Sequence, residues 1–204
     1  MDSSWDATRR AFHEAAAWFV GTTALVGERW QQPGLGEWDV LALVGHTSRS
    51  LLTVETYVAR PAPAVEVASA ADYFRVTRAL AASPAVAARG RDAGTALGGD
   101  PATAVAEIAE RVRRLIDSLT GTELVSTIAG GMRLADYLPT RTFELTVHTS
   151  DLAAALGVEA DIPATAAAHA LGIVTQLAVA DGLAAPLLLA ATGRPGLPPG
   201  FSVL

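Results

Sequence analysis

Two histidines and a glutamate are the residues of this chain best suited to bind a metal ion. Glu144 and His148 lie four residues apart in the segment 141–151 (RTFELTVHTSD), so on a helix they share one face and can chelate one divalent ion. His46 lies among apolar residues, directly after Gly45. If helix packing brings His46 to the pair, two histidines and one carboxylate form a site with open coordination positions, which is typical of catalytic zinc.

Each part of this candidate site also has a simpler interpretation. Glu144 and His148 can form an ordinary helical pair at the surface, and His46 can be a core histidine with satisfied hydrogen bonds. Asp151 extends the polar stripe by a further turn and can accept a hydrogen bond from a ligand histidine. The spacing alone leaves these alternatives open.

The remaining candidates are weaker. Arg49 and Arg141 can hold an anionic substrate or cofactor, or they can be ion-pair partners within the fold. His13 precedes Glu14, but no second histidine completes the metalloprotease helix motif, so we expect it to be structural or at the surface. His169 lies among alanines; it could line a cavity, but a structural role is favoured.

The composition excludes several kinds of chemistry. The chain of 204 residues has no cysteine, and each of its 15 basic residues is an arginine. A cysteine nucleophile, a cysteine-ligated metal, a lysine Schiff base and a Walker-type phosphate loop are therefore excluded. The glycines fit no dinucleotide-binding pattern, and the Gly-x-Ser-x-Gly motif of serine hydrolases is missing. Any thiol or amine in the reaction must come from a ligand.

Charge and hydrophobicity restrict the partners and the location. The net charge of −6 argues against nucleic acid, and Arg111, Arg113 and Arg114 are flanked by glutamates at helical spacing, which indicates a solvated helix face. The most apolar stretch, 183–191, is too short to cross a membrane, and no secretion signal is visible, so we expect a cytoplasmic protein. The 50% of hydrophobic residues and the runs of alanine are compatible with a homodimer.

The elements that must position these residues are expected to be helices, because apolar residues recur at helical spacing and little alternation is present. An all-α protein is therefore predicted. The expected helices cover about 4–26, 39–58, 72–81, a short piece from Ser83-Pro84, 101–121, a helix from Pro139 or Thr140 to Gly157, 163–180 and 183–191. We expect irregular chain over 60–69, a loop over 125–138 with residues 132–137 extended, and no helix over 193–201.

Local signals mark the ends of several of these helices. Asp39 and Asp100 are predicted N-caps, and Gly157 is a suitable left-handed C-cap. Trp38 precedes the first of these caps and could staple the helix entry to the core. Gly45 would allow another helix or a ligand to approach closely.

The sequence resembles the DinB-like metal-binding superfamily, and within it actinobacterial proteins similar to the metal-binding domain of mycothiol-dependent maleylpyruvate isomerase. The match rests on residues 36–40 (GEWDV) through His46, on 141–148 (RTFELTVH) through Asp151, and on the closing segment 193–198 (GRPGLP). The resemblance implies a four-helix bundle with short extra helices and loops over residues 1–193, followed by an irregular C-terminal tail over 194–204. The alanine- and arginine-rich composition suits such a source.

The resemblance also implies a function. Residues His46, Glu144 and His148 would bind a divalent metal, zinc first and nickel or iron as alternatives, and mycothiol would bind near it as thiol cosubstrate. We therefore expect an enzyme that activates mycothiol for transfer to, or isomerisation of, a small electrophilic substrate. The alternatives are a non-enzymatic metal-binding module or sensor, or a bundle that has lost both functions.

Maleylpyruvate itself is not the expected substrate. The isomerase that the sequence resembles carries a C-terminal domain that contributes an arginine to the reaction, and this chain ends about where that domain would start. A thiol transfer, or the isomerisation of another compound, is easier to reconcile with one domain.

Overall fold

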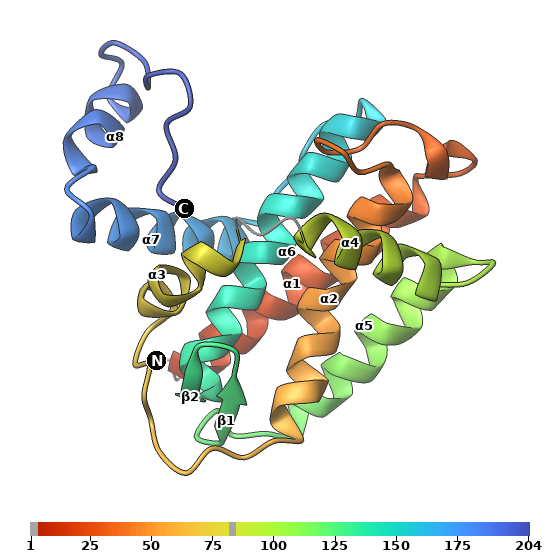
Figure 1. Cartoon of the computed structure of the whole chain (residues 1–204), viewed down its shortest axis with the longest axis horizontal. Helices are drawn as coiled ribbons and strands as arrows, with labels where there is room; N and C mark the ends of the chain where they lie inside the picture. The colour runs from red at the N-terminus through yellow and green to blue at the C-terminus, as the bar shows by residue number, and fades with distance from the viewer. Residues whose placement is uncertain (1–3, 82–84) are drawn as a thin grey trace.

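The computed structural model of the chain describes residues 4–81 and 85–204. Four long helices form its centre: α1 (Ser4–Ala24), α2 (Val40–Val58), α5 (Pro101–Asp117) and α6 (Leu134–Leu156) (Figure 1). Helix α1 packs on α5 and α6, and α2 packs on the same two helices, so the four close into a bundle. The predicted all-α bundle is confirmed.

Shorter elements surround this bundle. They are a 3-10 turn η1 (Arg29–Gln31), α3 (Ala70–Ala81), α4 (Ala85–Ala96), the strands β1 (Leu124–Thr127) and β2 (Gly130–Arg133), α7 (Ala164–Ala180) and α8 (Ala184–Ala191). Helix α4 packs across α2, whereas α3 and α7 pack on α6. Helix α8 and the chain after it project from the bundle (Figure 1). None of the helices described here combines the length and apolar character needed to cross a lipid bilayer.

The core follows from helical periodicity. On α6, Leu138, Leu145 and Leu152 lie seven residues apart, and all three side chains are fully buried. On α1, Phe12 and Phe19 have the same spacing and are equally buried. Each such side chain stabilises the fold by about 1.5–3 kcal/mol when it leaves water, which is enough to hold the helices that carry the site.

The predicted helix caps are confirmed. The Asp39 side chain accepts a hydrogen bond from Ala42 N at 2.8 Å, and the Asp100 side chain accepts one from Thr103 N at 3.1 Å. Gly157 ends α6 with φ of 66°, a left-handed conformation that glycine adopts without strain. Of the short piece expected from Ser83-Pro84, these two residues lie outside the described part, and α4 begins at Ala85.

The predicted end of the helix at Gly121 is wrong, because α5 ends at Asp117. The Glu123 carboxylate accepts hydrogen bonds from Thr120 N and Gly121 N at 2.9 and 2.8 Å. These bonds satisfy backbone donors in a turn, so the chain leaves the helix before it reaches Gly121.

The predicted loop over 125–138 is also wrong. Its first part forms an antiparallel hairpin in which Leu124 pairs with Arg133 and Thr127 pairs with Gly130. The irregular segment before α3 supports this hairpin, since Ser126 N donates to Arg60 O at 2.8 Å. The extension expected for 132–137 holds only for the end of β2.

Helix α6 begins at Leu134, five residues before the predicted Pro139. Pro139 therefore lies inside the helix, where it has no N–H to donate to the preceding turn. Leu134, Tyr137 and Leu138 are fully buried, and this packing compensates for the missing hydrogen bond. The early start matters for the site because it adds a turn before Arg141.

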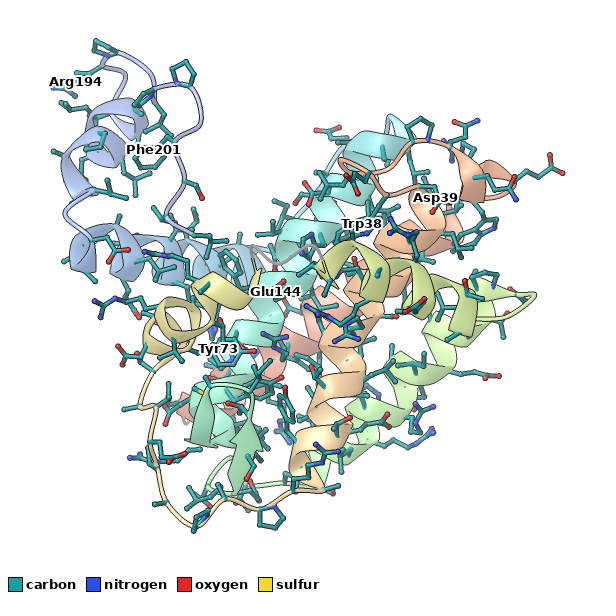
Figure 2. All side chains as sticks on the ribbon, viewed as in Figure 1. Trp38, Asp39, Tyr73, Glu144, Arg194 and Phe201 are labelled. Carbon is teal, nitrogen blue, oxygen red and sulfur yellow. The ribbon has the colours of Figure 1, made fainter. Side chains whose placement is uncertain are left out.

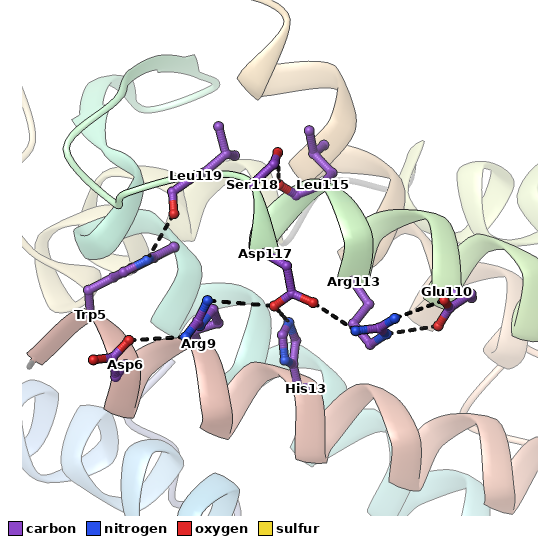
Figure 3. A network of polar contacts seen from close by, with 10 residues as sticks. All are labelled: Trp5, Asp6, Arg9, His13, Glu110, Arg113, Leu115, Asp117, Ser118 and Leu119. Carbon is purple, nitrogen blue, oxygen red and sulfur yellow. Dashed lines mark hydrogen bonds and ion pairs between the residues drawn. The ribbon is translucent and has the colours of Figure 1, made fainter. Parts of the chain in front are cut away.

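A polar seam joins α1 to α5 (Figure 3). Asp117 is contacted by Arg113 Nη1 at 2.7 Å, and by Arg9 Nη1 and His13 Nε2 at 3.7 Å each. Arg113 also pairs with Glu110, and both side chains are nearly half exposed, which confirms the predicted solvated face. Exposed pairs of this kind contribute at most about 1 kcal/mol each. His13 lies in this seam between α1 and α5.

The chain after α8 forms neither helix nor strand over residues 194–204 of the described structure. It returns toward α3, where Arg78 Nη2 donates to Val203 O at 3.0 Å. The predicted absence of helix over 193–201 is thereby confirmed.

Candidate metal centre

The structure brings the three predicted metal ligands together. His46 lies on α2, and Glu144 and His148 lie on the neighbouring helix α6. One ligand atom from each residue lies within 4.8 Å of the other two, a spacing that allows all three to contact one ion. His148 Nε2 is 3.2 Å from Glu144 Oε2. The imidazole rings of His46 and His148 meet edge to face, with 4.8 Å between their centroids.

Gly45 explains how the helices pack so closely beside His46. A Cβ atom on Gly45 would lie 2.1 Å from Gly94 N on α4, which leaves room for no side chain. The predicted close approach at Gly45 is therefore confirmed, and the approaching element is a helix. Helix α4 consequently lies against α2 at the residue before a candidate ligand.

Trp38 covers one side of His46. Their ring centroids are 4.4 Å apart, and Trp38 Nε1 donates to Ala87 O on α4 at 3.0 Å. Gly90 lies directly against the indole, because a Cβ there would come within 2.7 Å of the ring. Trp38 is thus fixed between α4 and His46. Trp38 was expected at the helix entry and in the segment 36–40 that carries the resemblance, and its two-turn distance from His46 was the available signal for this contact.

The electrostatics of His46 suit a neutral ligand. Burial, followed by the neighbouring His148, lowers the pKa of His46 to about 4. His46 Nδ1 is buried and has no hydrogen-bond partner among the residues that the structure describes. The alternative of a core histidine with satisfied hydrogen bonds does not fit this nitrogen, whereas a neutral imidazole is the form that binds metal.

The His148 imidazole lies between the carboxylates of Glu144 and Asp151, and this arrangement favours its positively charged form. Burial alone would raise the pKa of Glu144, but the hydrogen bond with His148 and the charge of Arg141 lower it to about 2. Burial alone would lower the pKa of His148, but the hydrogen bonds with Asp151 and Glu144 raise it to about 9. Both side chains are mostly buried, with 22% and 17% exposed, so they are not an ordinary surface pair.

Asp151 takes the position expected for a residue that orients a ligand. Its Oδ2 is 3.1 Å from His148 Nδ1, which leaves Nε2 directed to Glu144. Metal-binding histidines usually donate the other ring N–H to such a carboxylate, which fixes the ring and its tautomer. The donor set and its support therefore fit a divalent ion.

Arg141 is a buried cation held between aromatic rings. Only 8% of it is exposed, and its guanidinium carbon lies 5.1 Å from the Tyr137 ring centroid and 5.3 Å from that of Tyr73. Its Nε donates to Thr140 Oγ1 at 2.9 Å. Neither tyrosine was expected at the site: Tyr137 was expected in extended chain, and Tyr73 comes from α3, which no local pattern connects to Arg141.

The three candidate ligands and Arg141 line one pocket with a volume of about 380 Å³. Three of its lining residues, Trp38, Tyr73 and Glu144, are labelled in Figure 2. The three candidate ligands share the pocket with Arg49, Arg89 and Arg141, and with the apolar or aromatic side chains of Trp38, Tyr57, Tyr73, Phe74, Val86 and Ile128. The two remaining histidines are elsewhere, since His13 faces α5 and His169 is on α7.

A helical bundle that places two histidines and a glutamate on the wall of a pocket defines a candidate metal-binding domain. The chain belongs to the family of the mycothiol maleylpyruvate isomerase N-terminal domain, whose model matches residues 9–153. This region contains His46, Glu144, His148 and Asp151, and the predicted family is confirmed. Comparison with curated proteins gave no match, and comparison with solved structures gave none either.

Proposed function

We propose that this chain is a divalent-metal-dependent enzyme that activates mycothiol for transfer to, or isomerisation of, a small electrophilic substrate. One observation carries the proposal: His46, Glu144 and His148 converge within 4.8 Å beside a pocket, in a chain whose family is named for a mycothiol isomerase. A pocket of about 380 Å³ is the right size for a small molecule.

His46, Glu144 and His148 would hold the ion, and Asp151 would orient His148. Two imidazoles and one carboxylate suit zinc, with nickel or iron as alternatives, and leave room for a further ligand. When bound, such an ion lowers the pKa of a coordinated thiol and so favours the thiolate at neutral pH. The thiol must come from a cosubstrate, because the chain has no cysteine.

The other residues of the pocket bind and orient the electrophile. Arg141 packs against Tyr73 and Tyr137 and lines the pocket, where its guanidinium can bind a carboxylate or a carbonyl oxygen that gains charge. Arg49 lies one turn after His46 and supplies a second positive charge at the wall. Trp38 excludes water from one side of His46.

This arrangement supports two outcomes of the same addition. The sulfur of the thiolate forms a bond to a carbon that is conjugated with a carbonyl group, and the electron pair of the double bond moves to the carbonyl oxygen near Arg141. Rotation and expulsion of the sulfur return the thiolate and give the isomer. If a leaving group departs instead, the sulfur stays on the product and the reaction is a transfer.

Calorimetric titration of the zinc-loaded protein with mycothiol tests the proposal. We expect saturable binding that is weakened in His148→Ala and unchanged in His169→Ala, a histidine of α7 that lies outside the site. Turnover with a fluorogenic electrophile such as monochlorobimane should show the same pattern. If no thiol binds at millimolar concentration, the proposal is wrong.

Metal removal from the same protein distinguishes the proposed enzyme from a non-enzymatic metal-binding module. A structural metal module would unfold when the metal is removed and would accept neither a thiol nor an electrophile. The proposed enzyme keeps its fold without metal, because its core is formed by the packed faces of four helices.

A further inference from the structure

A second cleft, here called the outer groove, lies beside the pocket of the candidate metal ligands, here called the metal pocket. Arg49, Thr53 and Arg89 line both cavities, so the two are adjacent. The outer groove has a volume of about 360 Å³ and lies where α4 packs across α2 (Figure 1). Its remaining lining residues are Leu52, Thr56, Asp92 and Ala93.

The outer groove follows one face of α2 away from the candidate metal ligand. His46, Arg49, Thr53 and Thr56 succeed one another at steps of three, four and three residues, which places them in a single row. With a rise of about 1.5 Å per residue, this row is about 15 Å long. A ligand bound along it would therefore have one end at the metal ligands and the other end well outside the metal pocket.

The charged side chains of the outer groove have no ion-pair partners in the described part of the chain. Arg49, Arg89 and Asp92 form no ion pair with any residue of the described ranges, 4–81 and 85–204, whereas Arg111 on α5 binds Glu55 through two nitrogens at 2.6 and 3.0 Å. The groove thus offers free donors from two arginines and a free acceptor from Asp92.

Free donors and acceptors side by side suit hydroxyl groups, because each hydroxyl both donates and accepts hydrogen bonds. The hydroxyls of Thr53 and Thr56 add to this mixed lining, and Leu52 and Ala93 offer apolar surface to ring carbons. A polyanion would fit less well, since Asp92 would repel it.

We propose that the outer groove binds the glucosamine and inositol rings of mycothiol while its sulfur reaches the metal pocket. This inference rests on the proposed function, which makes mycothiol the ligand. Mycothiol carries a cysteinyl thiol at one end and two uncharged, hydroxyl-rich rings at the other, which matches a metal pocket with a polar groove beside it. The aromatic end of the metal pocket, at Tyr73 and Arg141, is then left for the electrophile.

The binding test uses N-acetylglucosaminyl-inositol, a neutral, sulfur-free probe of the ring part, with saturation-transfer NMR. We expect the probe to bind both the wild type and His148→Ala, since the outer groove does not require the metal. Arg89→Gln and Asp92→Asn should weaken binding about tenfold, the effect of losing a hydrogen bond to a charged group. Arg91→Gln is the matched control, because Arg91 is exposed on α4 and lines neither cavity.

Steady-state kinetics provide a second readout. Arg89→Gln and Asp92→Asn should each raise the ratio of KM for mycothiol to KM for N-acetylcysteine about tenfold, because N-acetylcysteine lacks the rings. Failure of the probe to bind, or binding of inorganic phosphate through Arg49 and Arg89 in its place, would overturn the inference. If the variants turn over thiols with an unchanged ratio of KM values, the groove inference is wrong and the proposed function stands. If the probe binds but no thiol is turned over, only the proposed function is contradicted.

Discussion

The imidazole of His148 and the carboxylate of Asp151 lie one turn apart on α6, with 3.1 Å between Nδ1 and Oδ2. This contact occupies one ring nitrogen and directs the other, Nε2, to Glu144 at 3.2 Å. The ring of His148 is therefore oriented from both sides by its own helix. A candidate ligand fixed in this way loses little freedom when it binds an ion.

Replacing Asp151 by alanine should weaken metal binding while the fold is retained. Without the carboxylate, the His148 ring is less restrained and its Nε2 is a weaker metal ligand. We therefore expect a loss of about 10–100-fold in zinc affinity. Competition with a chromophoric chelator measures this change. Asp161→Asn, a change in the exposed loop before α7, is the control. An unchanged affinity in Asp151→Ala would show that the contact does not orient a ligand.

Zinc uptake should depend on pH through His148. Its pKa of about 9 means that the metal-free protein carries a proton on His148 at neutral pH, whereas His46, with a pKa of about 4, is already neutral. The metal must displace that proton, so the apparent zinc affinity should rise about tenfold per pH unit from neutral pH to about pH 9 and then level off.

Calorimetry in two buffers of different ionisation enthalpy measures the protons released. We expect about one proton per zinc near pH 7, because only His148 is still protonated there. An affinity that stays constant between neutral pH and pH 9 would mean that His148 does not bind the ion.

Metal removal should leave the protein folded but less stable. The helices that carry the ligands are held by a core that includes Leu43, Leu51, Leu145 and Leu152, all fully buried, so the fold does not depend on the ion. Zinc at about 100 times its dissociation constant adds about 2.7 kcal/mol, which corresponds to roughly 5–10 °C in Tm for a chain of this size. Differential scanning calorimetry with and without chelator measures the shift.

His148→Ala should abolish this zinc-dependent shift, and His169→Ala should keep it. Loss of helical circular dichroism on chelation of the wild type would instead identify the ion as a structural element.

The α6 part of the candidate site could be predicted because it is local. Glu144, His148 and Asp151 share one helical face, and their spacing is visible without any tertiary information. The caps at Asp39 and Asp100 are equally local, since each side chain binds a backbone N–H of the first turn. Such features depend on residues close in sequence, and the structure confirms the helical face and both caps.

The start of α6 and the pocket walls could not be predicted in the same way. Pro139 is a strong local signal against a continuing helix, but the burial of Tyr137 and Leu138, which depends on distant segments, outweighs it. The hairpin was missed because its second strand begins with Gly130 and Gly131, which show no alternation of apolar and polar residues. The pocket walls from α3 and α4 depend on how those helices pack, which local periodicity does not determine.

The close contact between Gly45 and Gly94 predicts that alanine at Gly45 destabilises the protein, whereas alanine at Gly172, a helical glycine with open space around it, stabilises it. In Gly45→Ala the new Cβ would lie 2.1 Å from Gly94 N, so α4 must move away from α2. We expect a loss of about 1–3 kcal/mol in the free energy of unfolding, as for other overpacked cores. Because His46 follows Gly45 and Trp38 is held by α4, zinc affinity should fall as well.

Gly172→Ala on α7 is the matched control, because its Cβ would meet no atom within 4 Å. Alanine is the better helix former, so this variant should be more stable than the wild type by about 0.5–1 kcal/mol and should bind zinc unchanged. Urea unfolding at constant m-value measures both changes. Equal stability of Gly45→Ala and the wild type would mean that α4 does not pack directly on α2, and would remove the structural basis for Trp38 covering His46.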